Sequence, residues 1–447
     1  MMFKYIKLNN VFIAIFGCIV LQGCTSKKDP IIVTSNDFYS TIDMVTQIMV
    51  HDIFSPPVAS RIYVYPNIAA FEILSQNSTA YKPLAGQLKD LKAIPKADDE
   101  AVNLNVSALV AHMELSKELV FSEDKVIQFR DSIYDLWIDQ NKVEFKASET
   151  YGLKVANHIK EWMNKDNYSQ TRTMPKYTIE TEDPSRWQPT PPAYMDGIEP
   201  HWKKIRNMVL DSASQFKPIP PPKFSMKKDS DFYKELIEVY TVNQDITKRG
   251  DDSEEIEIAQ FWDCNPYVSV TRGHLMFATK KITPGAHWIG ITKIACKKND
   301  FNFEEAVYTY TKTSIGIFEA FISCWDEKYR SNLIRPETLI NQFIDEKWMP
   351  ILQTPPFPEY TSGHSVVSGS ASTILTSIFG DNFIFIDDTE TAYGLPLRIF
   401  TSFNNAADEA AISRLYGGIH YRAAIDEGLK QGRKLGAFVI EKINMKH

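Results

Sequence analysis

The sequence contains few cysteines, no excess of positive charge and no second apolar run of membrane-spanning length after its N-terminal segment. Five cysteines occur among 447 residues without any CxxC spacing, and three of them (Cys264, Cys296 and Cys324) lie in the body of the chain. This pattern argues against a disulfide framework, a cysteine-rich zinc motif or haem attachment, so buried free thiols are the simplest interpretation. The formal net charge of −7 argues against nucleic-acid binding, which normally requires a basic face.

The N-terminal segment has the pattern of a secretory signal. Lys4 and Lys7 precede the apolar run VFIAIFGCIVLQGC, which is short for a transmembrane helix. LQGC, at 21–24, resembles the bacterial lipoprotein processing motif, which implies a signal peptide at 1–23, a lipid on Cys24 and a polar tether at 24–35. We therefore expect a bacterial cell-envelope protein, anchored only by this lipid at the periplasmic or outer-membrane face. A plain cleaved signal and an uncleaved anchor are the alternatives.

Most periodic segments have helical spacing, and alternating strand patterns are few. The sequence predicts an all-α fold in which two helix bundles form one compact unit, with an N-terminal half at 36–250 and a C-terminal bundle at 251–447. Two proline-rich loops, at 174–202 and 216–224, interrupt the helices. Helices are predicted at 42–53, 102–120, 124–139, 150–164, 229–244, 302–325, 336–345, 364–379, 405–415 and 422–441.

Three segments of the C-terminal third combine cationic side chains, glycines and histidines. They are WDEKYRSNLIRPET at 325–338, PPFPEYTSGHSVV at 355–367 and SRLYGGIH at 413–420. Taken singly, each has an ordinary explanation: a solvated cation pair, a serine cap before a core helix, and a helix that ends at two glycines. Taken together they favour an anion site, because arginine matches oxyanion geometry and a helix start at SGH offers unpaired N–H groups.

The order K-x6-RP, SGH, R-x5-H resembles the signature of the phosphatidic acid phosphatase type 2 and vanadium-dependent haloperoxidase superfamily. The resemblance directly covers 326–420. The WD-x-KY motif, the phenylalanine seven residues before the SGH histidine and SR-x5-H are most similar to the bacterial vanadium iodoperoxidases. The resemblance implies a vanadate site in the C-terminal bundle and a haloperoxidase that oxidises halide, with iodide expected, using hydrogen peroxide.

The resemblance also assigns a role to each matching position. His420 would ligate vanadium, His364 would act as acid and base, and Lys328 would also polarise the peroxide. Trp325, Phe357 and Tyr267 would line the halide side of the pocket, although simple core packing is equally open for the first two. Asp326 would be a carboxylate that supports the vanadate-binding residues without contacting vanadate itself. The residues implied in holding vanadate are Lys328, Arg335, Ser362, Gly363, Arg414 and His420.

Two other functions remain open on the same residues. One is an acid phosphatase that uses His420 as its nucleophile, and the other is a tethered oxyanion-binding protein with a vestigial site. Phosphatases of the superfamily usually carry an aspartate four residues after the last histidine, where it orients the ring; here that position is Ala424, and Asp426 is only near in sequence. This absence favours the peroxidase. The sequence does not fix the oligomeric state, and a monomer is the working expectation.

Overall fold

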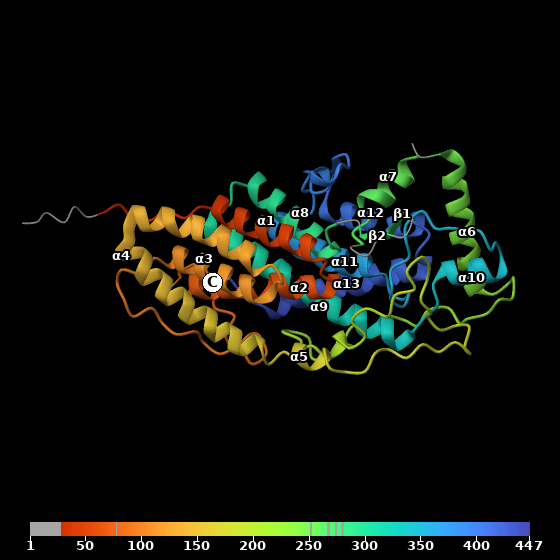
Figure 1. The fold of residues 1–447 in the computed structure, drawn as a ribbon, viewed down its shortest axis with the longest axis horizontal. Coiled ribbons are helices and arrows are strands. Elements are labelled where there is room, and N and C mark those ends of the chain that lie inside the picture. Colours follow the sequence, from red (N-terminus) through yellow and green to blue (C-terminus); the bar gives the residue numbers. More distant parts are fainter. Residues whose placement is uncertain (1–27, 77, 251–252, 266–268, 273–274, 279–280) are drawn as a thin grey trace, which may run out of the picture.

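The structure, a computed structural model, describes residues 28–447 except 77, 251–252, 266–268, 273–274 and 279–280. The predicted lipid site at Cys24 and the predicted pocket residue Tyr267 lie outside the described residues. Helices dominate the described chain, as predicted (Figure 1). The strands form two small antiparallel sheets, β1 (Ser269–Arg272) with β2 (Leu275–Ala278) and β3 (Phe385–Asp387) with β4 (Arg398–Phe400).

The helices follow one another along both halves of the chain. The N-terminal half contains α1 (Ser35–Asp52), α2 (Pro56–Ser75), α3 (Leu104–Leu119), α4 (Glu123–Met163), α5 (Tyr168–Thr171), η1 (Trp202–Lys204) and α6 (Asp231–Arg249). The C-terminal half contains α7 (Glu254–Phe261), α8 (Pro284–Lys298), α9 (Phe303–Ser331), α10 (Pro336–Phe343), α11 (Gly363–Phe379), η2 (Thr391–Tyr393), α12 (Phe403–Tyr416) and α13 (Arg422–Lys442).

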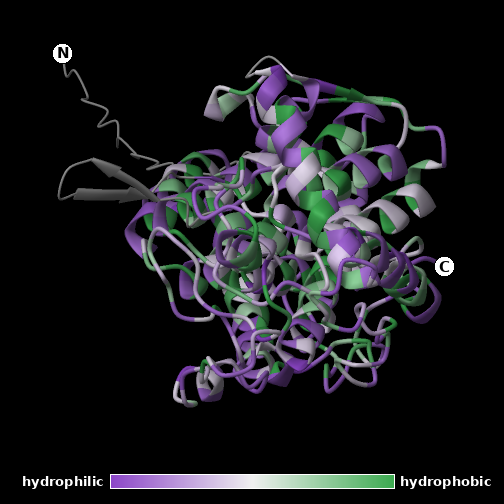
Figure 2. Ribbon diagram, turned by 90° about the vertical axis from the view of Figure 1, so that its right-hand side faces the viewer, coloured by the Kyte–Doolittle hydropathy of each residue, from purple (hydrophilic) through white to green (hydrophobic). Residues whose placement is uncertain are grey.

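Helix α9 joins the two halves into one body. It packs against α1 and α2 of the N-terminal half and against α8, α11 and α13 of the C-terminal half. One apolar cluster runs through both halves along this helix, and the apolar colour in Figure 2 is correspondingly strong on the inner helices. Helix α9 is buried over most of its length, so Lys328 in its last turn lies inside the molecule.

Helices α2, α5, α7 and α8 have no counterpart among the predicted helix ranges, and two of the differences have a clear physical reason. Helix α2 was not predicted, because all of its residues are buried and the sequence therefore shows no polar face; it also contains Pro66. The predicted helices 124–139 and 150–164 are parts of α4, which bends at Asn141, where φ is −153° and ψ is 85°. A buried helix and a bend both remove the regular spacing on which the prediction depended.

The close packing of α11 against α13 fixes the start of α11. A Cβ atom on Gly432 of α13 would lie 2.1 Å from the carbonyl oxygen of Val366, so glycine is required for this approach. At the same interface the backbone N–H of Ser362 donates to the carbonyl of Ala424 over 3.0 Å. The N-terminus of α11 is thereby held beside the first turn of α13.

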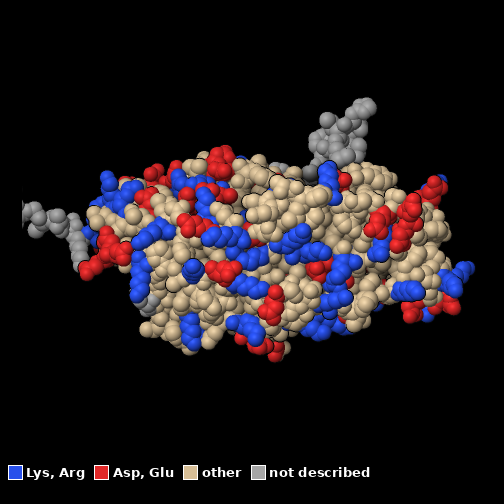
Figure 3. Space-filling model, turned by 90° about the horizontal axis from the view of Figure 1, so that it is seen from below, with Lys and Arg blue, Asp and Glu red and all other residues tan. Residues whose placement is uncertain are grey.

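The surface shows neither a large patch of one charge on the face in Figure 3 nor, among the described residues, a membrane-spanning helix. Basic and acidic side chains are interspersed on the face shown in Figure 3, in keeping with the modest net charge. Among the described helices, none has the length and apolar character that crossing a bilayer requires.

Candidate functional site

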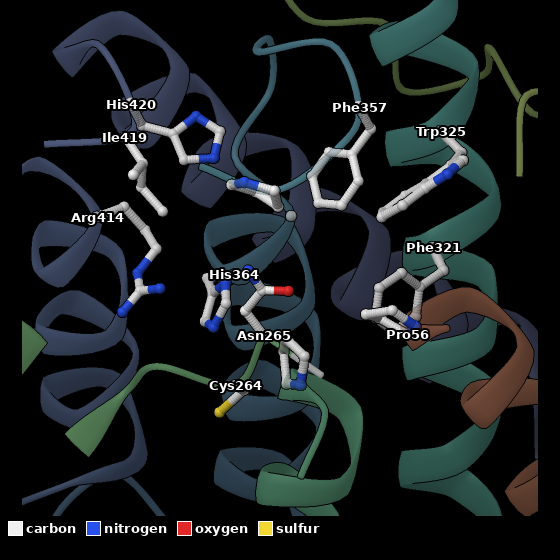
Figure 4. A pocket seen from close by; sticks show the side chains of 13 residues that line it. Pro56, Cys264, Asn265, Phe321, Trp325, Phe357, His364, Arg414, Ile419 and His420 are labelled. Carbon is white, nitrogen blue, oxygen red and sulfur yellow. The ribbon is translucent and has the colours of Figure 1, made fainter. Parts of the chain in front are cut away.

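The fold brings the three cation- and histidine-bearing segments to one buried place. Lys328 lies in the last turn of α9, and Arg335 caps α10, which begins at Pro336. Ser362 caps α11, so Gly363 and His364 form its first turn. The last members, Arg414 and His420, come from the end of α12 and from the turn before α13. His364, Arg414 and His420 surround one cavity in Figure 4.

The SRLYGGIH turn depends on one glycine conformation. Gly418 has φ of 77°, in the left-handed region that side chains with a Cβ rarely adopt. Its turn reverses the chain between the end of α12 and the start of α13, and Ile419 N–H donates back to the carbonyl of Arg414 over 3.2 Å. The turn therefore sets His420 and Arg414 side by side at the cavity.

Lys328 and Arg335 are fully buried cations. Nζ of Lys328 donates to the carbonyls of Pro358 and Glu359, each at 3.1 Å. Nε of Arg335 donates to the carbonyl of Phe357 over 2.9 Å, while its Nη2 is buried without a partner among the described residues. Burial lowers the pKa of Lys328 to about 7 and that of Arg335 to about 10. The neighbouring carboxyl group of Glu359 compensates these two cations only in part, because burial raises its pKa to about 8, and the remaining buried positive charge favours a bound anion.

His420 is held in one tautomer by a carboxylate. Its Nδ1 lies 2.7 Å from Oε1 of Glu359, and the same oxygen accepts from the Tyr421 N–H over 2.9 Å. Nη1 of Arg335 lies 3.2 Å from Nε2 of His420 and can only donate. The proton therefore sits on Nδ1 and the lone pair on Nε2, which is the arrangement a metal-ligating imidazole needs.

The structure corrects the sequence argument from Ala424. The missing aspartate is replaced in space by Glu359, which lies three residues before Ser362 and orients the His420 ring. Asp426 does not take this role, because its electrostatic neighbours are Arg422 and other side chains away from the cavity. The absence of a carboxylate at 424 therefore gives no reason to exclude a phosphatase. Glu359 was not identified from the sequence as the partner of His420.

His364 is a neutral base with a free nitrogen. The backbone carbonyl of Trp262 hydrogen-bonds its ring, and Nε2 is buried without a partner among the described residues. Burial, together with the nearby cations Arg414 and His287, lowers the pKa of His364 well below its ordinary value. Burial and the charges of Arg335 and Lys328 do the same for His420. Both rings are therefore uncharged near neutral pH.

Arg414 closes the polar side of the cavity. Its Nε donates to Oγ of Ser413 over 2.9 Å, and its Nη2 donates to the carbonyl of Ala259 over 3.1 Å. The guanidinium is only 1% exposed, and burial lowers its pKa. These bonds hold a third cation beside the two histidines without neutralising it.

Aromatic rings form the opposite wall. Trp325, Phe357 and Phe321 face the histidines and Arg414 across the cavity in Figure 4. The Trp325 and Phe357 ring centroids are 5.0 Å apart, and Nζ of Lys328 lies 4.9 Å from the Phe357 ring centroid. A Cβ on Gly363 would lie 3.6 Å from the Trp325 ring, so glycine leaves room in this cavity.

Asp326 is placed differently from the sequence expectation. Its carboxylate is 3.1 Å from Nη2 of Arg330 on the same helix, and that guanidinium also pairs with Glu327. This ion-pair cluster occupies the Asp326 carboxylate, which makes no hydrogen bond or ion pair with a described residue that lines the cavity. Any support it gives to the site passes through α9.

The described site fits vanadate, the cofactor that the resemblance implies. Arg335 Nη2 is an orphaned buried donor, the first turn of α11 presents N–H groups without helical acceptors, and His420 Nε2 offers a lone pair. Arginine and lysine donors suit the oxygens of a tetrahedral anion, while a ring nitrogen suits a transition metal. The fold and the site thus define a helical-bundle enzyme that binds a ligated oxyanion.

Comparisons with known proteins agree with that class. A family profile described as the VCPO second helical-bundle domain matches residues 309–447. The crystal structure of a bacterial vanadium-dependent iodoperoxidase is 64% identical and superposes with a TM-score of 0.91, covering 94% of this chain and 99% of that one. A holo-type bacterial vanadium-dependent chloroperoxidase is 16% identical, with a TM-score of 0.67 over 88% of this chain and 93% of the other, and shows the shared fold.

A third relative matches over a shorter stretch. The vanadium-dependent bromoperoxidase of Corallina officinalis is 30% identical over 166 residues, which are 34% of this chain and 27% of that protein. The high identity of the iodoperoxidase over nearly its whole length decides the assignment. The chain belongs to the vanadium-dependent haloperoxidase family, and it is an enzyme of that family.

Proposed function

We propose that the protein binds vanadate and uses hydrogen peroxide to oxidise iodide to hypoiodous acid. The balanced reaction consumes one halide ion, one hydrogen peroxide and one proton, and yields hypohalous acid and water. Bound vanadate would supply the Lewis-acidic centre that activates the peroxide. The observation that carries the proposal is His420, whose Nδ1 is held by Glu359 so that the lone pair stays on Nε2 among buried cations.

The chain would hold the cofactor through charge and orientation. His420 would ligate the metal through Nε2, and the cations would neutralise the oxygens that the ligand brings into a buried place. Ser362 and the Gly363 N–H stand at the start of α11, where the positive end of the helix favours an anion. Lys328 would have a further role, because its ammonium group could polarise the hydrogen peroxide. The oxyanion-binding set is Lys328, Arg335, Ser362, Gly363, Arg414 and His420.

His364 is suited to move the proton. Its ring is neutral and its Nε2 has no partner among the described residues, so this atom can accept a proton from hydrogen peroxide. The same atom can return that proton to the oxygen that leaves as water. The carbonyl of Trp262 keeps the ring oriented during both transfers.

The aromatic wall supports iodide as the halide. Iodide is large, polarisable and the easiest common halide to desolvate and oxidise, so an apolar wall beside fixed cations suits it. Trp325 and Phe357 supply that wall, and Lys328 lies against the Phe357 ring. The similar solved structure is that of an iodoperoxidase.

Steady-state halide oxidation tests the proposal. Purified protein, loaded with vanadate and supplied with hydrogen peroxide, is expected to oxidise iodide well above a vanadate-only blank and faster than bromide or chloride. Triiodide absorbance reports the iodide reaction. Activity on a chromogenic phosphate monoester with no halide oxidation would reject the proposal in favour of a phosphatase.

Phosphate ester hydrolysis is the second candidate, because Glu359 orients His420 as a nucleophile would require. Vanadate would inhibit this activity by occupying the same cations. The two activities can be assayed on one preparation, with and without vanadate.

Vanadate affinity is expected to fall above pH 7. Lys328 has a pKa of about 7 because of burial, and an anion binds its charged form, so binding above this pH must take up a proton. The affinity advantage of the natural protein over Lys328→Met should be largest below pH 7 and should then shrink by up to about tenfold per pH unit. Vanadate titrations of both proteins at several pH values measure this difference and cancel the ionisation of vanadate itself. A constant advantage from pH 6 to pH 9 contradicts the assignment of Lys328.

We also propose that Cys24 carries the lipid anchor in the bacterial cell envelope, on the LQGC pattern and the preceding apolar run. Mass spectrometry of the N-terminal peptide would show a diacylglyceryl cysteine. An unmodified Cys24 at the mature N-terminus would reject this anchor.

A further inference from the structure

A second cluster of metal-ligating side chains lies next to the active-site cavity. It consists of Cys264 after α7, His287 in the first turn of α8, and Glu390 after β3, all of them buried. Cys264 also lines the cavity, where it is seen below His364 in Figure 4. The halide oxidation proposed above uses none of these three side chains.

The three donor atoms form a triangle of the size that a tetrahedral zinc ion requires. Sγ of Cys264 lies 3.6 Å from Nδ1 of His287 and 3.9 Å from Oε1 of Glu390, and Nδ1 lies 3.3 Å from that oxygen. Zinc bonds of about 2.3 Å to sulfur and about 2.0 Å to nitrogen and oxygen set neighbouring donors about 3.3–3.6 Å apart. The measured edges need little movement to meet this geometry.

A carboxylate already supports the histidine from the other side. Nε2 of His287 lies 2.9 Å from Oδ2 of Asp387, and Thr389 donates its hydroxyl to Oδ1 of the same carboxylate over 2.7 Å. With Nε2 donating to Asp387, Nδ1 is the nitrogen that can face an ion. This carboxylate–histidine arrangement is typical of protein metal ligands.

Charge balance also permits an ion at this place. Without metal, attraction to Asp387 and hydrogen bonds to Asp387, Cys264 and Glu390 overcome burial and raise the pKa of His287 well above its ordinary value. Burial raises the pKa of the Cys264 thiol, so that group is protonated. A divalent cation that displaces one proton from each leaves the net charge of the cluster unchanged.

We propose that Cys264, His287 and Glu390 form a second metal site, which takes a zinc-like divalent cation and is distinct from the vanadate site. The mixed sulfur, nitrogen and oxygen donor set suits zinc or cobalt(II) rather than magnesium or calcium. Three protein ligands leave a fourth position for water. Asp387 is the positioning residue of this site.

Cobalt(II) binding to the chelator-treated, vanadate-free full-length protein tests the proposal. One equivalent should bind and give a thiolate-to-cobalt charge-transfer band with tetrahedral d–d bands, and zinc should displace it. Cys264→Ser should lose the charge-transfer band, while Cys296→Ser, at a buried thiol outside the cluster, should keep it. Asp387→Asn should weaken cobalt affinity about 10- to 100-fold if it orients the ligand.

Two results would overturn the second metal site. One is the absence of stoichiometric cobalt or zinc binding to the natural protein, which would leave His287 as a buried ion-pair partner only. The other is a charge-transfer band that persists in Cys264→Ser. Iodide oxidation is assayed on the same preparations after vanadate loading, so failure of the second site and failure of the proposed haloperoxidase are recorded separately.

Discussion

Replacement of His420 by alanine is expected to abolish vanadate binding and halide oxidation together. The ring supplies the lone pair at Nε2, and no other described nitrogen at the cavity is both neutral and held opposite a carboxylate as His420 is by Glu359. Loss of the ligand itself should weaken vanadate binding by at least about 100-fold, since loss of an outer partner alone costs 10- to 100-fold. Equilibrium dialysis of vanadate against the variant measures this loss.

His364→Ala is the matched control for this experiment. It removes a neighbouring buried imidazole that we place at proton transfer, so vanadate should still bind while turnover falls about 100-fold or more. The two variants separate ligation from acid–base chemistry. If His420→Ala retained both vanadate and iodide oxidation, the assignment of His420 as the vanadium ligand would be wrong.

The C-terminal motifs were predictable because their chemistry is local. A proline fixes the start of α10, a serine caps α11, and paired glycines mark the turn before α13. These features placed Arg335, Ser362 and His420 at element ends, where side chains and N–H groups converge. The all-α fold followed from helical spacing, which is strong in half-buried helices such as α6 and α13.

The partners that orient these side chains were not predictable. Glu359 reaches His420 from 61 positions away, and Asp387 reaches His287 from 100 positions away. No spacing rule links such pairs, because only the tertiary packing of different helices and loops brings them together. Helix α2 was not predicted for a different reason: all of its residues are buried, so its sequence has no polar face and no alternation between polar and apolar residues at helical spacing.

Glu359→Ala is expected to weaken vanadate binding about 10- to 100-fold, whereas Glu359→Gln should bind as well as the natural protein or better. Oε1 of Glu359 accepts from His420 Nδ1 and from the Tyr421 N–H. A glutamine carbonyl oxygen can accept both bonds and so keep the lone pair on Nε2, while alanine leaves the ring free to rotate and change tautomer. Glutamine also removes a carboxyl group whose pKa burial raises to about 8, which leaves the cations with less internal compensation.

Vanadate titration and unfolding curves of the two variants decide between orientation and charge. If the hydrogen bonds orient the ligand, affinity separates the variants by at least about tenfold, although both lack the charge. If Glu359 acts through its negative charge instead, glutamine and alanine change the affinity alike. Equal and large losses in both variants, with unfolding midpoints close to that of the natural protein, would therefore contradict the role assigned to Glu359. If only the glutamine variant keeps its affinity for vanadate, the function of Glu359 is to hold His420 as the neutral tautomer protonated at Nδ1.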